Sequence, residues 1–157
     1  MKSITIRIIF GATVTLLAFA AYAYRGRSIV TAQQREPVMA TRLFTGADGL
    51  SHAERISVKL SAIPGGPDTI EQSEPVKVTS SYVVRLAPGF FESWHNADKR
   101  RYVIPISGRA EIEIAGGEKI YAEPGQIFLA EDLTGKGHTF RVLGTNDWVA
   151  LFVQFAE

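Results

Sequence analysis

Short segments with a period of two, separated by corners rich in glycine, dominate the chain from residue 41 onward. Arg109 to Ile114 alternates charged and apolar residues, and Ile56 to Leu60 alternates in the same way. Ser107-Gly108, Gly116-Gly117 and Pro124-Gly125 separate such segments with turn residues. Alternation places successive side chains on opposite faces of a strand, and no window after residue 40 sustains a helical period. The pattern predicts an all-β sandwich or barrel of antiparallel strands. Further predicted strand segments lie at residues 76–78, 82–86, 119–122, 138–143 and 148–155.

The composition is typical of one globular domain. Apolar residues make up 46% and charged residues 21% of the 157 positions, which disfavours disorder. The formal net charge is +1, and no basic stripe with interleaved aromatic residues occurs, so a nucleic-acid partner is not expected. The sequence contains no cysteine, which excludes disulfides, thiolate metal ligands and a cysteine nucleophile.

The first 23 residues differ from the rest of the chain. Two basic residues, Lys2 and Arg7, precede an apolar run at residues 8–23 that ends in small residues. This order is typical of a secretory signal peptide. The alternative is an uncleaved hydrophobic helix that anchors the chain in the inner membrane, because a run of this length nearly spans a bilayer. Arg25 and Arg27 favour the anchor, since positive charge directly after the run opposes export.

These features divide the chain into three parts. We expect a signal peptide or anchor at residues 1–23, a linker without periodicity at 24–40, and a β-barrel domain at 41–157. The protein is then either exported to the periplasm or the extracellular space, or tethered to the membrane through residues 8–23. A start at Met39, which would remove the apolar run, is a third possibility.

One stretch of the barrel region resembles the cupin superfamily of small jelly-roll barrels. The first cupin motif is a Gly, five residues, His-x-His, three or four residues, a Glu, six residues and a Gly. Gly89, His95, Ala97, Arg101 and Gly108 reproduce this spacing, although Ala97 replaces the second His and Arg101 replaces the Glu.

The second cupin motif has a Pro-Gly corner followed by a His ligand, and Pro124-Gly125 and His138 fit this order. The resemblance covers roughly residues 75 to 155. It implies a single cupin-type jelly-roll barrel whose exposed edges often pair, so a homodimer is expected. It implies no particular activity, because cupins include dioxygenases, isomerases, epimerases, sugar-binding modules and storage proteins.

The resemblance also implies a metal site that has lost ligands. Three histidines and one carboxylate would hold iron, manganese, nickel or zinc, whereas His95 and His138 alone bind such ions weakly. The permanent positive charge of Arg101 opposes a nearby cation. We therefore expect no cofactor, or a weakly bound divalent transition metal on His95 and His138. Four carboxylates could replace the missing ligands: Glu92, Asp98, Glu131 and Asp132.

Without a metal, the same residues predict a pocket for a small anionic or carbonyl compound. With a period of two, His95 shares a face with Ala97, and Arg101 shares one with Val103. The resemblance implies that these faces and His138 point into the barrel. A guanidinium beside two imidazoles can bind a carboxylate, phosphate or enolate. The pocket would then support proton abstraction next to a carbonyl, with a histidine as base and Arg101 stabilising the negative charge.

Three further residues are candidates for ligand binding. Trp94 and Tyr102 could supply a flat wall, and Asp132 could orient an imidazole and fix its tautomer. His52 lies in a polar segment, expected to be a loop, and gives no signal.

Several alternatives stay open at this stage. The pocket could bind or sense a ligand without turnover, or the domain could be a scaffold. His95 and His138 could be rim histidines bonded to the backbone, and Arg101 could form a structural ion pair with Asp98 or Glu92.

Overall fold

The protein is described by a computed structural model over residues 35–67 and 69–156. All regular elements in this part are β-strands, apart from one short 3-10 turn at Ala115–Gly117. None of its helices is long and apolar enough to cross a membrane. The predicted signal peptide or anchoring helix at residues 1–23, and the linker up to residue 34, lie outside the described residues.

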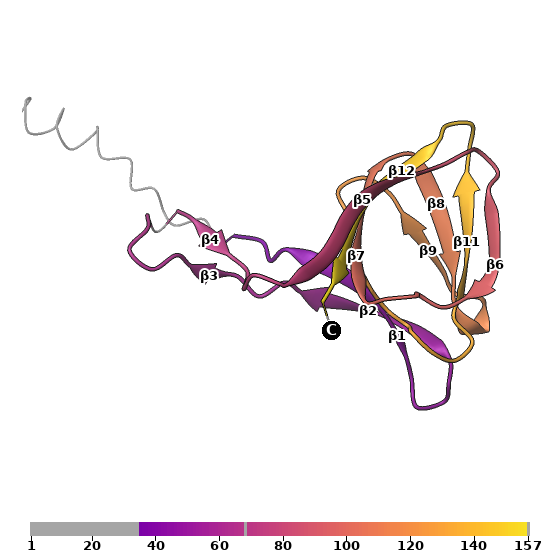
Figure 1. Cartoon of the computed structure of the whole chain (residues 1–157), viewed down its shortest axis with the longest axis horizontal. Coiled ribbons are helices and arrows are strands. Elements are labelled where there is room, and N and C mark those ends of the chain that lie inside the picture. Colours follow the sequence, from indigo (N-terminus) through magenta and orange to yellow (C-terminus); the bar gives the residue numbers. More distant parts are fainter. Residues whose placement is uncertain (1–34, 68, 157) are drawn as a thin grey trace, which may run out of the picture. The chain divides into compact units, whose positions relative to one another are not determined.

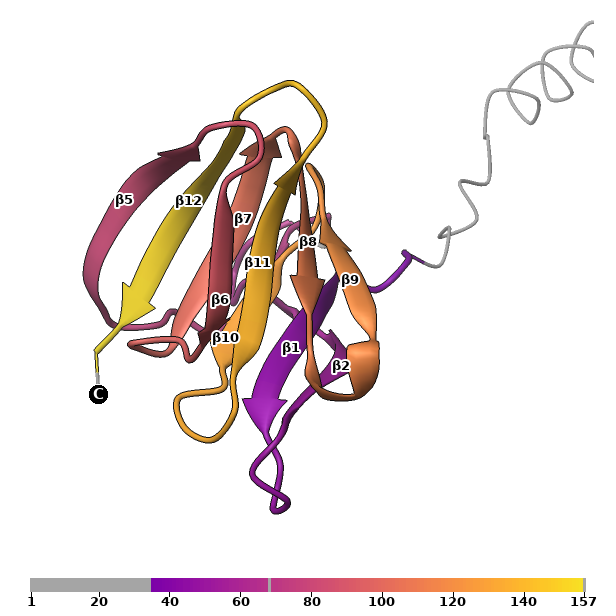
Figure 2. The same cartoon turned by 90° about the vertical axis from the view of Figure 1, so that its right-hand side faces the viewer.

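Two sheets face each other, as Figures 1 and 2 show. The larger sheet contains β1 (Met39–Thr45), β2 (Ser51–Ser57), β5 (Val78–Leu86), β7 (Arg101–Ser107), β10 (Phe128–Glu131) and β12 (Trp148–Phe155). The smaller sheet contains β6 (Phe91–His95), β8 (Arg109–Glu113), β9 (Lys119–Ala122) and β11 (His138–Leu143). A separate hairpin consists of β3 (Ser61–Ala62) and β4 (Glu71–Gln72).

The strand order is β2-β1-β10-β7-β12-β5 in the larger sheet and β6-β11-β8-β9 in the smaller one. Neighbours in the sheets are distant in the sequence, as in the parallel pair of β1 and β10 and the antiparallel pair of β6 and β11. The described residues therefore form an all-β domain of two facing sheets.

The strand predictions are mostly confirmed, and the turn residues explain why. Residues 119–122, 138–143 and 148–155 form strands with the predicted bounds. Gly108, at the turn between β7 and β8, has a positive φ of 77°, and a Cβ there would overlap the Asp147 carbonyl oxygen. Only glycine fits this corner.

Three boundaries differ from the prediction. The segment at residues 56–60 is not one strand. Its first two residues belong to β2, whose pairing with β1 ends at Ser57, opposite Met39. The first strand begins at Met39, two residues before the predicted start of the barrel, since Ala40 is buried and pairs with Ile56. The predicted segments at 76–78 and 82–86 belong to one strand, β5.

The core lies between the two sheets and is closed at one end by an indole. Ala110 and Ile112 on β8 point inward, as their alternation predicts, and are at most 5% exposed. Trp148 is 1% exposed, and its Nε1–H donates to the Ala122 carbonyl oxygen at 3.2 Å. Full burial of such side chains stabilises the fold by roughly 1.5–3 kcal/mol each. This end of the barrel is therefore well packed, and the cavity described next opens at the other end.

Candidate functional site

A cavity of about 360 Å³ lies between the two sheets. Its wall is apolar over most of its area, with Leu43 of β1, Phe128 of β10 and Phe152 of β12 among the contributing residues. The polar wall residues come from β6, the loop after it and the first residues of β7 and β11. They are Glu92, His95, Asn96, Asp98, Arg101 and His138. Apolar cavities with a few convergent polar groups are the usual form of ligand sites.

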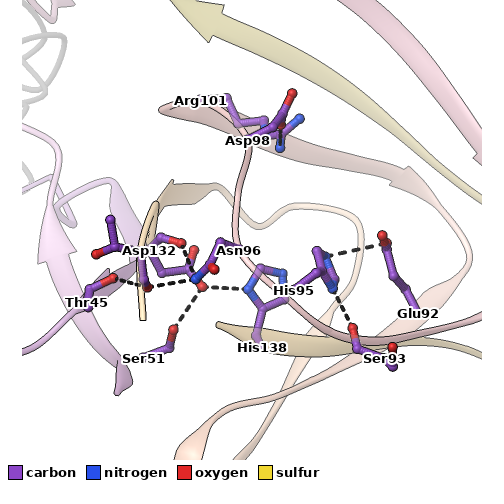
Figure 3. Close-up of polar contacts among 11 residues, drawn as sticks. Thr45, Ser51, Glu92, Ser93, His95, Asn96, Asp98, Arg101, Asp132 and His138 are labelled. Atoms are coloured by element: carbon purple, nitrogen blue, oxygen red, sulfur yellow. Dashed lines mark hydrogen bonds and ion pairs between the residues drawn. The ribbon is translucent and has the colours of Figure 1, made fainter. Parts of the chain in front are cut away.

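A buried chain of hydrogen bonds holds His138. Its Nδ1 lies 2.6 Å from Asp132 Oδ2, and the same oxygen accepts a bond from Ser51 Oγ at 3.0 Å, as Figure 3 shows. Asp132 is 0% and Ser51 is 1% exposed. A carboxylate at Nδ1 makes that nitrogen the N–H donor, so the lone pair of neutral His138 is on Nε2. His138 lines the cavity, and Nε2 is the nitrogen left for a ligand.

The second oxygen of Asp132 is unusual. Oδ1 is buried and has no hydrogen-bond partner among the described residues. A buried carboxylate that lacks part of its hydrogen bonding depends strongly on the partners it has. Asp132 is thus stabilised when His138 carries a second proton, because the imidazolium then compensates its charge.

His95 lies against His138 but has different partners. The two ring centroids are 4.4 Å apart. His95 Nδ1 lies 2.8 Å from the Ser93 carbonyl oxygen, which can only accept, so Nδ1 carries a proton. Its Nε2 lies 3.4 Å from Glu92 Oε2, and its side chain is 28% exposed. In Figure 3, His138 lies between Asp132 and His95, so the inner imidazole contacts the buried acid and the outer one an exposed acid.

The local backbone explains why the two imidazoles meet. His95 ends β6 and His138 begins β11, and the two residues are partners in the antiparallel register. Gly137 has a φ of 73°, and a Cβ there would overlap the His95 carbonyl oxygen. Asn96 Nδ2 donates to the Thr134 carbonyl oxygen at 2.7 Å. Close backbone approach and this bond tie the loop after β6 to the loop after β10, at the same end of the barrel (Figure 2).

Arg101 lines the cavity and is already paired. Its guanidinium forms an ion pair with Asp98 and lies 3.4 Å from the Tyr82 hydroxyl oxygen. It also lies over the Phe152 ring, at 5.1 Å from the centroid. The Arg101 side chain is 12% exposed, whereas that of Asp98 is 65% exposed. The predicted inward orientation and the alternative of an ion pair with Asp98 are therefore both present.

Each basic side chain in the described cavity wall thus has its own carboxylate. The pairs are His138 with Asp132, His95 with Glu92, and Arg101 with Asp98. Because Asp98 compensates the charge of Arg101 and each histidine already faces a carboxylate, the wall offers little net attraction to a free anion. It does offer donors and acceptors for a neutral carbonyl group, and acid–base pairs that can move a proton.

The residues present do not fit the divalent metal that cupins often hold. No group of three or more histidine, aspartate or glutamate side chains with metal-binding geometry occurs in the described part. Glu131, one candidate replacement ligand, is engaged by Arg42 and Arg100 instead. Asp98 and Asp132 are paired with Arg101 and His138, and Ala97 supplies no donor. The donor set thus reduces to two imidazoles and Glu92, whose Oε2 lies 3.4 Å from His95 Nε2, with a guanidinium in the same wall.

Two predicted ligand-binding residues do not reach the cavity. Trp94 is 39% exposed, and the Lys136 ammonium lies 4.0 Å from its ring centroid. Tyr102 packs edge-on against Phe155, with centroids 4.9 Å apart. Both neighbour an inward residue in the chain, so strand alternation turns them to the opposite face. Neither forms the flat wall that the sequence analysis expects.

Two residues that the sequence analysis does not single out complete the site. Ser51 contacts Asp132 across 81 positions of sequence. Tyr82 bonds to Arg101 and accepts from Gln154 Nε2 at 3.2 Å. Neither residue belongs to a local motif, so only the strand order could identify them. The expected contact of Asp132 with an imidazole, in contrast, is present.

Comparison with known proteins adds little to this description. No protein-family model and no curated protein matches the chain. Several solved structures are similar at low identity, among them the following three. A cupin-2 domain protein from Shewanella frigidimarina is 15% identical, covers 56% of this chain and 86% of its own, and has a TM-score of 0.36.

The other two have the same level of similarity. The Cupin_2 domain of an XRE family transcriptional regulator from Enterobacter cloacae is 20% identical, covers 49% of this chain and 81% of its own, and has a TM-score of 0.36. A protein from Neisseria meningitidis is 13% identical, with 56% and 90% covered and a TM-score of 0.37. At such scores the likenesses carry no argument, and the fold rests on the strand pairing above.

Proposed function

We propose that the cavity binds a small carbonyl compound and that His138 removes a proton from the carbon next to the carbonyl. The observation that carries this proposal is the contact of His138 Nδ1 with the fully buried Asp132. It orients the imidazole, assigns its lone pair to Nε2 on the cavity side, and stabilises the imidazolium formed by proton transfer.

The step balances without a co-reactant. The C–H bond next to the carbonyl breaks, its proton goes to His138 Nε2, and its electron pair forms the C=C bond of an enolate. The negative charge collects on the carbonyl oxygen. Arg101 retains N–H donors beyond those that face Asp98 and Tyr82, and one of them is assigned to this oxygen. Return of a proton from His138 to the carbon completes the exchange.

The paired charges favour a carbonyl compound over a strong anion. A free carboxylate or phosphate would have to compete with Asp98 for Arg101 and would lie near Glu92. A neutral ketone avoids this repulsion and acquires negative charge only during the reaction, when the donors are most useful.

The test is deuterium exchange at the carbons next to the carbonyl of 2-heptanone, followed by proton NMR in D2O with the full chain. We expect catalysed exchange, reduced by at least about 100-fold in His138→Gln and by a similar factor in Arg101→Gln. Asp132→Asn should give an intermediate loss. His52→Gln, on the surface, is the matched control and should retain the rate. Equal exchange in the wild type and in His138→Gln would refute the proposal.

The same experiment separates an enzyme from a binding module. If 2-heptanone raises the melting temperature of the wild-type chain but not of Arg101→Gln, while no exchange occurs, the cavity binds carbonyl compounds without turnover.

Whether the site holds a metal is tested separately. Full chain purified without a His tag should contain far less than one transition-metal ion per protein, by elemental analysis, and a stoichiometric ion would contradict our reading of the donor set.

Other expectations from the sequence stay predictions. They are export or membrane tethering through residues 8–23 and formation of a homodimer.

A further inference from the structure

The cavity is polar at one end and apolar at the other, and the register of β12 shows the order. Along this strand, Gln154 pairs with Arg101, and Phe152 pairs with Val103. Further along, Trp148 pairs with Leu86 of β5. These last two pairs line the cavity, and their only polar group is the N–H of the buried Trp148 indole. In the larger sheet, the polar side chains therefore stop at Arg101, and apolar side chains follow from Val103 inward.

The smaller sheet has the same order. His138 pairs with His95 at the rim, and one step further in Phe140 pairs with Ile112 of β8 and with Glu92 of β6. Phe140 and Ile112 line the cavity, and the Glu92 carboxylate, also in the wall, contacts His95 Nε2 at 3.4 Å. The polar groups of both sheets thus gather around the histidines, and apolar residues of both sheets lie behind them.

The apolar part is large enough for a ligand segment of several carbons. Its deep wall is made of packed rings, with the Phe152 and Trp148 centroids 6.4 Å apart, so its capacity is set by volume and not by strand length. Trp148 lies at the far end and is 1% exposed. The volume of about 360 Å³ lies within the range of cavities that hold whole small molecules, and a carbonyl group alone would leave most of it empty.

We infer that the site takes carbonyl compounds with an apolar body, an alkyl chain or ring of several carbons, that extends from the histidines toward Trp148. This inference rests on the proposed function for the position of the carbonyl group. Ala122 sets the length that fits, because its small side chain lies in the cavity wall beside Trp148 and is 1% exposed. The substrate class is thus amphiphilic: reactive at one end and hydrocarbon at the other.

The experiment measures the affinity of the full chain for acetone, 2-pentanone, 2-heptanone and 2-nonanone. The chain has two tryptophans, and only Trp148 lines the cavity, so fluorescence of the Trp94→Phe variant reports on the apolar end. Each added methylene should tighten binding by roughly three- to fourfold until the cavity is full, after which the gain stops. Equal affinity across the series would overturn the inference.

Two variants test where the body lies. Ala122→Val should lower the affinity for the longest ketones and leave acetone unchanged. Phe152→Leu removes volume from the wall and should extend the series to a longer chain, which also decides the matter if Ala122→Val fails to fold. Ala62→Val, in the exposed hairpin strand β3, is the matched control. A chain-length profile that neither cavity variant alters would place the hydrocarbon elsewhere and contradict the inference.

Failure of this inference is distinguishable from failure of the proposed function. If the protein catalyses deuterium exchange in both acetone and 2-heptanone but binds the two equally well, His138 remains the base and the apolar body of the ligand is rejected. If the affinity rises with chain length but no exchange occurs, the apolar body is retained and proton abstraction is rejected.

Discussion

Two His–Asp pairs occur among the described residues, one buried and one exposed, and the contrast shows how burial changes the effect of the same contact. His138 and Asp132 are 10% and 0% exposed in their side chains, with 2.6 Å between Nδ1 and Oδ2. His52 and Asp48 are 45% and 49% exposed, with 3.0 Å between Nε2 and Oδ2. Water screens the second pair, whereas in the first the partners depend on each other.

The pairs also differ in what they do to the residues around them. The His52 hydrogen bond and that from the Leu50 N–H lower the pKa of Asp48, a local effect within one surface turn. Asp132, in contrast, connects β2, the loop after β10 and β11 through Ser51 and His138. The buried pair therefore couples distant strands to the cavity, whereas the exposed pair links only the start of β2 to the turn before it.

Removal of the histidine from each pair should give the largest difference. We expect His138→Ala to lower the free energy of unfolding by about 3–5 kcal/mol, because the buried Asp132 carboxylate loses its Nδ1–H donor and the missing imidazole leaves a cavity. His52→Ala should change it by less than the error of urea denaturation. Equal losses for the two variants would mean that burial does not distinguish the pairs.

The glycine that brings the buried pair together comes next. Gly137→Ala should cost about 2–4 kcal/mol, since a left-handed backbone and an overlap with the His95 carbonyl oxygen add together. Gly89→Ala is the control. It has a φ of 77° but open space around its Cα, so only the backbone cost of about 1–2 kcal/mol is expected. Thermal unfolding of both variants measures the steric share, and similar losses would argue against close approach at Gly137.

Ser51 tests the outer link of the buried chain. Ser51→Ala removes one hydrogen bond to Asp132 and should lower the free energy of unfolding by about 1–2 kcal/mol. If the proposed base is correct, the exchange rate should also fall, since Asp132 then has more freedom. Ser93→Ala, on the exposed strand β6, is a matched control because His95 uses the backbone carbonyl of Ser93. A Ser51→Ala chain with unchanged stability would show that Asp132 does not need this bond.

The Glu131 side chain is 14% exposed, between Asp132 at 0% and Asp48 at 49%, and its substitution should give the smallest effect. Burial raises its pKa, but hydrogen bonds from Arg42 and Arg100 lower it more, and the net pKa lies below the ordinary value of 4.5. A lowered folded-state pKa stabilises the fold above pH 4.5, and this contribution disappears as the pH falls through the folded-state pKa. The free energy of unfolding, measured by urea denaturation at several pH values from 6 to about 3, should therefore fall less with pH in Glu131→Gln than in the wild type. An unchanged acid slope would contradict this account.

The sequence predicts the strands well because their signal is local. Alternation in β8 and glycine at the corners are properties of neighbouring residues, and β9, β11 and β12 have the predicted bounds. The prediction that His52 lies in a loop is wrong, since it belongs to β2 and packs at 5.8 Å from the Phe44 ring. Its neighbours are polar and give no alternation, and only pairing with β1 makes this segment a strand.

The site is predictable only in part, for the same reason. Strand parity places His95, Arg101 and His138 inward, and all three line the cavity. Parity also excludes Trp94 and Tyr102, next to inward residues, although their residue types suggest a ligand wall. The ion pair of Arg101 with Asp98 spans three residues and can be anticipated, whereas the contact of Ser51 with Asp132 cannot.

By itself, the sequence determined the all-β class, the glycine-rich corners, and the presence of Ala97 and Arg101 at two positions where the cupin motif has metal ligands. These are consequences of alternation, backbone conformation and side-chain chemistry, which act within a few residues. The tertiary structure alone decided that each base in the cavity has its own acid, and that polar and apolar residues divide the cavity between its two ends. Such pairings depend on which strands become neighbours, and strand order follows from burial summed over the whole domain rather than from any local segment.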